Sequence, residues 1–298
     1  MKLIAIALLL CSSLGAWHRN GHMLVAWIAY QHLSPAARSR VDAALQTHPD
    51  YQKWIADLPS EGERGVEAFL QASVWPDTIK NDPRFYNDMR ADAKETPPLP
   101  GIPDTAMHQN WHYIDYSIET HGSKGFPIEE PNAVSAISAV IVDLSNPHNL
   151  SWMIHLTGDL HQPLHAVSRF SGHHHGQNAG VDTGDQGGNL FLIDDPAHNL
   201  HSLWDGVFDN VGSRADLIAI GKTLAPPADL AVRLDTQAWI SESVQLAKSA
   251  VYPLGEDVDG EAPPKPSAKY RQKMMDVSKL QIALAGYRLA AILNDRLQ

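Results

Sequence analysis

The chain has 298 residues, of which 44% are hydrophobic, enough for one large domain with a substantial core. Its formal net charge of −11 argues against a surface that holds nucleic acid through lysine and arginine alone. Nucleic acid stays open as a substrate if bound metal ions supply positive charge. Cys11 is the single cysteine, which excludes a disulfide framework, so rigidity must come from the core or from bound metal.

Residues 1–16 have the pattern of a secretory signal peptide. Lys2 is the basic start, residues 3–10 are an apolar run too short to span a bilayer, and small residues lead to Ala16. We expect cleavage before Trp17 and a catalytic domain over 17–298. Because Lys2 is the only charged residue removed, that domain carries a net charge of about −12. It is expected to be secreted or periplasmic, monomeric, and without stable membrane association.

The rest of the chain is predicted to be helical. Residues 22–32 carry apolar side chains at helical spacing, and Ser34 before Pro35 predicts the cap and first turn of a second helix. Further helices are predicted at 63–74, 132–145, 148–162, 199–209, 213–223, 235–251 and 267–296, with loops at 81–107, 171–188 and 253–266. Residues 112–118 and 189–194 are the only candidate strands. The pattern predicts one all-α domain with long loops and at most a minor hairpin.

Histidine and carboxylate side chains recur at spacings that suit metal binding. His155 and Asp159 are four residues apart and share a helix face, as do His201 and Asp205. His165 follows the helix-ending Pro163. His112 lies in "WHYID" and Asp77 in "SVWPD", which reads as a proline-bounded turn. One such pair is compatible with ordinary pairing along a helix, but several together favour zinc, which takes His and carboxylate ligands when cysteine is absent.

Most other histidines are predicted to be solvated residues outside any metal site. The run His173–His175 lies in a glycine-rich loop and is expected to be solvated, although such a run also suits an exported zinc-binding protein with many weak sites. His161 is out of helical phase with His155 and is expected either to support a metal ligand from behind or to be structural. The remaining bystanders are His18, His32, His48, His108, His121, His148 and His198.

Motifs along the whole mature chain, in this order, resemble the S1/P1 nuclease family of zinc-dependent nucleases and 3′-nucleotidases. They are Trp17 with His22, Trp75-Pro76-Asp77, Trp111-His112-Tyr113-Ile114-Asp115, the segment from His155 to His165 with its Q-P-L-H, Gly187-Gly188-Asn189, and Asn199 to Asp205. Each ligand position of the family pattern carries the expected residue type. The resemblance implies the mainly helical fold that this family shares with zinc-dependent phospholipase C.

The resemblance also implies three zinc ions per chain. Their ligands would be Asp77, His112 and His155 for the first; His22 and the α-amine and carbonyl oxygen of Trp17 for the second; and His165, His201 and Asp205 for the third, with Asp159 bridging the first two. An α-amine has a pKa of about 8, so it can bind metal near neutral pH. This arrangement requires cleavage directly before Trp17.

The implied activity is hydrolysis of single-stranded DNA and RNA to 5′-phosphate products, and of 3′-nucleotides, by a hydroxide that bridges two zinc ions. The implied catalytic residues are Asp77, Asp159 and Lys80. Lys80 stands where the family usually has an arginine that contacts phosphate. The implied substrate-binding residues are Tyr113, which would stack on a base, Asp115 at the base edge, and Gly188 and Asn189 at the phosphate or the attacking water.

A zinc-dependent phospholipase C is the nearest alternative. That group shares the fold and a mature N-terminal Trp. Its pattern has Glu at the last ligand position, where this chain has Asp205, and it lacks the "WHYID" context. The resemblance therefore favours nucleic acid over phospholipid as the substrate.

Overall fold

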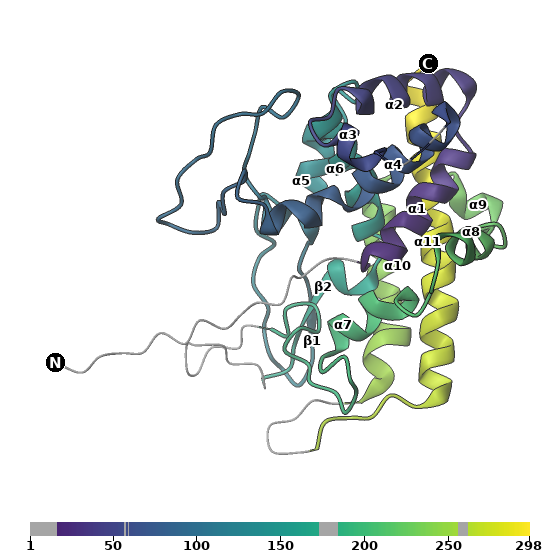
Figure 1. Cartoon of the computed structure of the whole chain (residues 1–298). Coiled ribbons are helices and arrows are strands. Elements are labelled where there is room, and N and C mark those ends of the chain that lie inside the picture. Colours follow the sequence, from purple (N-terminus) through teal and green to yellow (C-terminus); the bar gives the residue numbers. More distant parts are fainter. Residues whose placement is uncertain (1–16, 57, 59, 173–183, 256–261) are drawn as a thin grey trace.

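The structure, a computed structural model, describes residues 17–56, 58, 60–172, 184–255 and 262–298, and it is mainly helical (Figure 1). The predicted signal peptide and His173–His175 lie outside these ranges. The helices are α1 (Arg19–Gln31), α2 (Pro35–Gln46), α3 (Tyr51–Trp54), α4 (Glu61–Thr78), η1 (Ile79–Asn81), η2 (Gln109–His112), α5 (Ala133–Val140), α6 (Pro147–Asp159), η3 (Pro163–His165), α7 (Leu200–Asp205), η4 (Gly206–Phe208), α8 (Arg214–Gly221), α9 (Ala228–Ala231), α10 (Thr236–Leu246), η5 (Ala247–Val251), η6 (Tyr252–Leu254) and α11 (Ala268–Arg296).

The core forms where α1 packs against α4 and α11, and α6 packs against α4 (Figure 1). Helix α1 is buried from Gly21 to Tyr30 because other helices cover it on several sides. Tyr30 on α1 packs against Phe69 on α4 with ring centroids 5.4 Å apart, and both side chains are buried in the core cluster. Burying such a side chain contributes about 1.5–3 kcal/mol, so these contacts hold the two helices that carry His22 and Asp77.

Local capping sets the start of α2 as the sequence predicts, and a cap at Asn146 that was not predicted sets the start of α6. Ser34 Oγ accepts a hydrogen bond from Ala37 N at 3.1 Å, and Pro35 occupies the first turn of α2. Helix α6 begins at Pro147, with Asn146 Oδ1 accepting from His148 N at 2.9 Å. The helix ends at Asp159, so His155 and Asp159 occupy its last two turns.

Helix α4 is longer than predicted and changes the setting of Asp77. It continues through Pro76 to Thr78, so Asp77 lies in the last helical turn, and the expected proline-bounded turn was wrong. Pro76 has no backbone N–H, so the hydrogen bond that this position would donate to the carbonyl of Ala72 is lost, a local cost that the packing of α4 in the core offsets. Lys80 follows in η1, three residues from Asp77.

The described residues contain one small sheet, formed by β1 (Tyr116–Glu119) and β2 (Val167–Phe170). The strands are parallel, with Tyr116 opposite Val167 and Glu119 opposite Phe170, so they form no hairpin. Strand β1 overlaps the candidate at 112–118. The candidate at 189–194 forms only an isolated bridge between Leu192 and Asn199. Strand β2 lacks alternating burial because both of its faces are covered, and periodicity therefore could not reveal it.

Within the described ranges, no helix combines the length and apolar character needed to cross a bilayer. The long segment between η1 and η2 projects away from the helical body on the left of Figure 1.

Candidate metal centre

The last two turns of α6 are the centre of a buried group of metal-ligating side chains. Asp159 Oδ2 lies 3.3 Å from His155 Nε2 and 3.1 Å from His112 Nδ1, which η2 brings from the side. Asp159 Oδ1 lies 3.3 Å from His22 Nε2 on α1. Asp77 Oδ1 on α4 is 3.8 Å from His112 Nδ1. Both oxygens of Asp159 therefore face potential ligands, as a bridging carboxylate requires.

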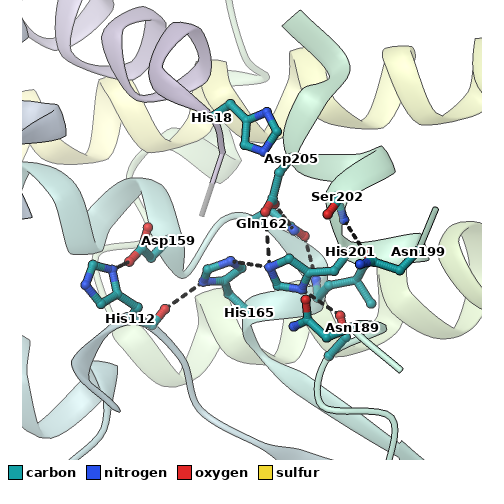
Figure 2. Close-up of polar contacts among 12 residues, drawn as sticks. His18, His112, Asp159, Gln162, His165, Asn189, Asn199, His201, Ser202 and Asp205 are labelled. Carbon is teal, nitrogen blue, oxygen red and sulfur yellow. Dashed lines mark hydrogen bonds and ion pairs between the residues drawn. The ribbon is translucent and has the colours of Figure 1, made fainter. Parts of the chain in front are cut away.

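A second group forms where η3 meets α7. His165 Nε2 lies 3.2 Å from His201 Nε2, and His201 Nε2 lies 3.1 Å from Asp205 Oδ2 (Figure 2). All three side chains are buried. Each group offers three or more His and Asp atoms within 4.8 Å of one another, the spacing that a single ion can bridge.

Backbone carbonyls orient three of these imidazoles. The Nδ1 atoms of His155, His165 and His201 donate to the oxygens of Ser73, His112 and Gly187, each at 2.7 Å. Figure 2 shows the contact between His165 and His112. A neutral ring that donates through Nδ1 keeps a lone pair on Nε2. The Nε2 atoms of His165 and His201 then point lone pairs at each other. Two nitrogens on one tetrahedral zinc, each bound at about 2.0–2.1 Å, lie roughly 3.3 Å apart, so the pair fits a shared cation.

Unpaired buried atoms indicate that the first group also fits a cation. His22 Nδ1 and Nε2, His112 Nε2 and Asp159 Oδ1 are buried without a hydrogen-bond partner among the described residues. Leaving such atoms unpaired is costly, so the sequence tolerates them only where something else satisfies them. A divalent cation satisfies His22 Nε2 and Asp159 Oδ1 together.

Burial shifts the ionisation of this group strongly. Burial raises the pKa of Asp159 to about 7 and lowers the pKa of His155 to about 4. Burial and the neighbouring His155 lower the pKa of His22 to about 4. Burial opposes ionisation of Asp77, but the Lys80 ammonium and the nearby imidazoles outweigh it and bring its pKa to about 2. The imidazoles are thus held neutral, which is the form that binds metal.

Two partners of the second group were not anticipated from the sequence. Buried Gln162 donates from Nε2 to Asp205 Oδ1 at 2.6 Å and accepts from Leu164 N at 2.6 Å, which leaves Asp205 Oδ2 to face His201 (Figure 2). Gly187 adopts φ +62°, and a Cβ there would lie 2.4 Å from Leu164 O. Only glycine lets this carbonyl reach His201. Gln162 belongs to the Q-P-L-H motif, the one signal that pointed to it.

Trp17 begins the described chain next to the second group. Its side chain is fully buried, and the next residue, His18, donates its backbone N–H to Asp205 O at 3.0 Å. This contact brings the segment that carries Trp17 and His22 to the residue that closes the second group.

The residues expected to contact substrate lie next to the ligands of the two groups in the sequence or in the structure. Lys80 Nζ donates to Asp77 Oδ1 at 2.7 Å, and Tyr113, directly after His112, is 38% exposed. Burial and the nearby Asp185 raise the pKa of Asp115 to about 6. Gly188 O accepts from His201 N at 3.2 Å. Asn189 Oδ1 is buried without a partner among the described residues and lies beside His201 in Figure 2.

Outside these groups, the bystander histidines have several environments. His32, His121 and His198 are exposed. Solvation was the wrong expectation for His48 and His148, which are buried and pack edge-on against Trp75. The remaining partly buried bystanders are His18, which contacts Asp209, and His108, which stacks on Trp111.

His161 is structural, as its helical phase predicts. Its Nδ1 donates to Thr157 O at 2.7 Å, and its Nε2 accepts from Arg288 Nη1 at 2.8 Å. Both ring nitrogens are therefore used, and His161 belongs to neither metal group.

The comparisons with known proteins agree with this geometry. The profile of one family, described as S1/P1 Nuclease, matches residues 17–298. The chain is 24% identical to Nuclease S1 of Aspergillus oryzae, over 99% of this chain and 96% of that protein. It is 25% identical to Nuclease P1 of Penicillium citrinum, over 94% of this chain and 97% of that protein.

Proposed function

The chain belongs to the S1/P1 nuclease family, and on that premise we propose that it is a zinc-dependent hydrolase of single-stranded DNA and RNA. It would cleave internally, leave 5′-phosphate ends, and also hydrolyse 3′-nucleotides. The names of the two fungal relatives, Nuclease S1 and Nuclease P1, support a nuclease. The side chains of the two groups and their neighbours support the assignment of zinc, of the substrates and of the products.

The facing lone pairs of His165 and His201 carry this proposal. Two buried imidazole nitrogens at 3.2 Å, each with its proton committed to a backbone carbonyl, favour a cation between them. We assign three zinc ions per chain: one to Asp77, His112 and His155, one to Trp17 and His22, and one to the His165 group. Asp159 would bridge the first two.

Zinc supplies Lewis acidity and an activated water when it is bound. Asp77, whose side chain is 23% exposed, would accept a hydrogen bond from the attacking water because its low pKa keeps it ionised. Lys80 beside it would hold a phosphate oxygen as a point charge. These positive groups attract a polyanion to a chain whose formal net charge is −11.

The base and the flanking phosphate have their own candidate contacts. Tyr113 offers a half-exposed ring for stacking, which tolerates any base. Asp115 would meet the base edge, and Gly188 with Asn189 would contact phosphate or the attacking water.

We further propose that residues 1–16 are a signal peptide and that 17–298 form the catalytic domain. The match to the family profile begins at Trp17, which supports this boundary. The mature protein would act as a secreted or periplasmic monomer without stable membrane association.

Turnover on matched substrates tests the proposal. The mature protein is assayed on single-stranded DNA, RNA, 3′-AMP and a phosphatidylcholine analogue, with Asp159→Asn as the inactive control. We expect hydrolysis of the first three, 5′-phosphate ends on the polymers, and three zinc ions per chain after dialysis. Hydrolysis of the lipid alone would contradict the nuclease assignment in favour of a phospholipase C. Many weakly held ions without turnover would indicate a zinc-binding protein.

A further inference from the structure

The residues directly after Trp17 are fastened to the segment that follows Asp205. His18 N–H donates to Asp205 O at 3.0 Å, and Asn20 Nδ2 donates to Phe208 O at 3.0 Å. His18 Nδ1 lies 2.6 Å from Asp209 Oδ2, so the imidazole donates and the carboxylate accepts. These three hydrogen bonds, with a longer one of 3.5 Å from Asn20 Nδ2 to Val211 O, join residues 18–20 to residues 205–211.

This attachment sets the direction of the Trp17 carbonyl. The peptide bond between Trp17 and His18 is planar, and in the trans form its N–H and C=O point in opposite directions. Because the His18 N–H points at Asp205 O, the Trp17 carbonyl points away from it. Gly21 also lets Trp17 pack closely, since a Cβ there would lie 2.6 Å from Trp17 Cβ.

A chain terminus that binds metal must be held in place. Terminal residues fray unless contacts tie them down, and a ligand that moves by an ångström loses its geometry. The side chains of His18 and Asp209 are 39% and 48% exposed. Ion pairs with that exposure contribute little to global stability, so the effect of this one is expected to be local.

We propose that His18 and Asp209 form a clamp that positions the mature N-terminus for metal binding. The inference rests on the proposed function, in which Trp17 is a zinc ligand. His18 is a positioning residue: it contacts neither substrate nor metal, and it acts through the backbone of Trp17. The clamp also joins the zinc at Trp17 and His22 to the segment that carries Asp205.

Zinc affinity gives the first test. The mature protein is titrated with a zinc chelator, and the zinc retained per chain is measured for wild type, His18→Ala, His18→Asn and Asp209→Ala. We expect one of three ions to bind roughly tenfold more weakly in His18→Ala and Asp209→Ala, the lower end of the range for losing an outer-shell partner of a metal site. His18→Asn should recover most of the affinity because its amide retains a donor near the Nδ1 position.

Trimming of the metal-free protein gives the second test. An aminopeptidase removes Trp17 only when the terminus frays, and mass spectrometry measures the rate. We expect removal several-fold faster in His18→Ala than in wild type, with the same thermal midpoint. Arg90→Ala is the matched control, because it removes another exposed ion pair, with Asp92, in the projecting segment between η1 and η2. It should change neither measurement.

Both effects are required. Suppose that wild type retains three zinc ions. If His18→Ala then has the same zinc affinities or the same trimming rate as wild type, the clamp is contradicted and the proposed function is not. A wild-type protein that does not hold three zinc ions overturns the proposed metal set, whatever the variants do. A general loss of stability in His18→Ala would also overturn the clamp as a local device.

Discussion

The Nε2 atoms of His165 and His201 lie 3.2 Å apart inside the protein, while the Nδ1 atom of each ring donates to a backbone carbonyl. Two lone pairs at this distance repel unless a metal ion or a proton lies between them, and although burial opposes it, the carboxylate of Asp205 raises the pKa of His201. The pair therefore suits a metal site in which a cation takes the place of that proton.

Removal of metal should destabilise the protein. A site filled at a thousand times its dissociation constant contributes about 4 kcal/mol, and without metal the buried imidazoles and carboxylates lose their shared partner. We expect chelation to lower the thermal midpoint by at least roughly 8 °C and to abolish hydrolysis. Scanning calorimetry measures the midpoint and a turnover assay measures hydrolysis, each before and after re-addition of zinc. An unchanged midpoint in metal-free protein would contradict this account.

Asp159→Asn should remove two ions at once. Both oxygens of Asp159 face ligands of the first group, and the amide loses the charge that a bridge supplies. We expect zinc to fall from three to about one per chain and kcat to fall at least about 100-fold, the scale for losing one stabiliser of transition-state charge. Asp92→Asn, an exposed carboxylate, serves as the control. Retained activity in Asp159→Asn would refute the bridging role.

One extra residue before Trp17 should inactivate the enzyme. Extension by Met converts the α-amine into an amide, which does not serve as a neutral amine ligand. We expect loss of the zinc at Trp17 and His22 and of most hydrolysis, while the His165 group keeps its ion. N-terminal sequencing of the exported protein gives the natural start. Wild-type turnover from the extended form would exclude Trp17 as a ligand.

Preference between bases should depend on pH through Asp115. Burial, with Asp185 nearby, raises its pKa to about 6, so the carboxyl is ionised above that pH and protonated below it. The ionised form only accepts hydrogen bonds and suits guanine, which presents adjacent N–H donors, whereas the protonated form also donates and suits adenine. We expect the ratio of kcat/KM for 3′-GMP over 3′-AMP to fall several-fold from pH 7 to pH 5.

Asp115→Asn is the control for this ratio. Its amide does not titrate, so the ratio should stay flat over the same pH range. A comparison of ratios cancels effects of pH on the metal ions. A wild-type ratio that is equally flat would remove Asp115 from the base edge.

Arg288→Met should lower the free energy of unfolding and leave the two groups of metal-ligating side chains unchanged. Arg288 is fully buried and donates to Glu242 Oε1 and Oε2 at 2.9 and 2.8 Å and to His161 Nε2. Its loss leaves a carboxylate without its main partner, which costs about 3–5 kcal/mol. Urea unfolding with saturating zinc measures the change. The double variant with Glu242→Met should recover part of it, and equal stability of wild type and Arg288→Met would contradict the argument.

Much of the site could be predicted because ligands on one helix have a fixed spacing. His155 with Asp159, and His201 with Asp205, are four residues apart, and the helical period alone places each pair on one face. In the structure the imidazole Nε2 and the carboxylate Oδ2 lie 3.3 Å apart in the first pair and 3.1 Å apart in the second, which agrees with that spacing. The mainly helical fold followed from the same periodicity together with the cap at Ser34.

The remaining contacts depend on segments that meet only after folding. His22 reaches Asp159 because α1 packs into the centre of the helical body, and β2 pairs with β1 across about fifty residues of chain. Asp77 lies in a helix that continues through Pro76, which local rules disfavour and tertiary contacts allow. None of these positions has a periodic signal, because their partners are set by side-chain packing between distant helices.

The sequence by itself therefore determined the helical class, the paired ligands on α6 and α7, and the family. Only the tertiary structure decided which side chains lie close enough to share a cation, that Gln162 binds one oxygen of Asp205 and leaves the other facing His201, and that His18 contacts Asp209. The physical reason is the range of the interactions. Helical periodicity and capping act within a few residues, whereas the two groups need atoms from distant segments, four in the first group and two in the second, to converge within a few ångströms.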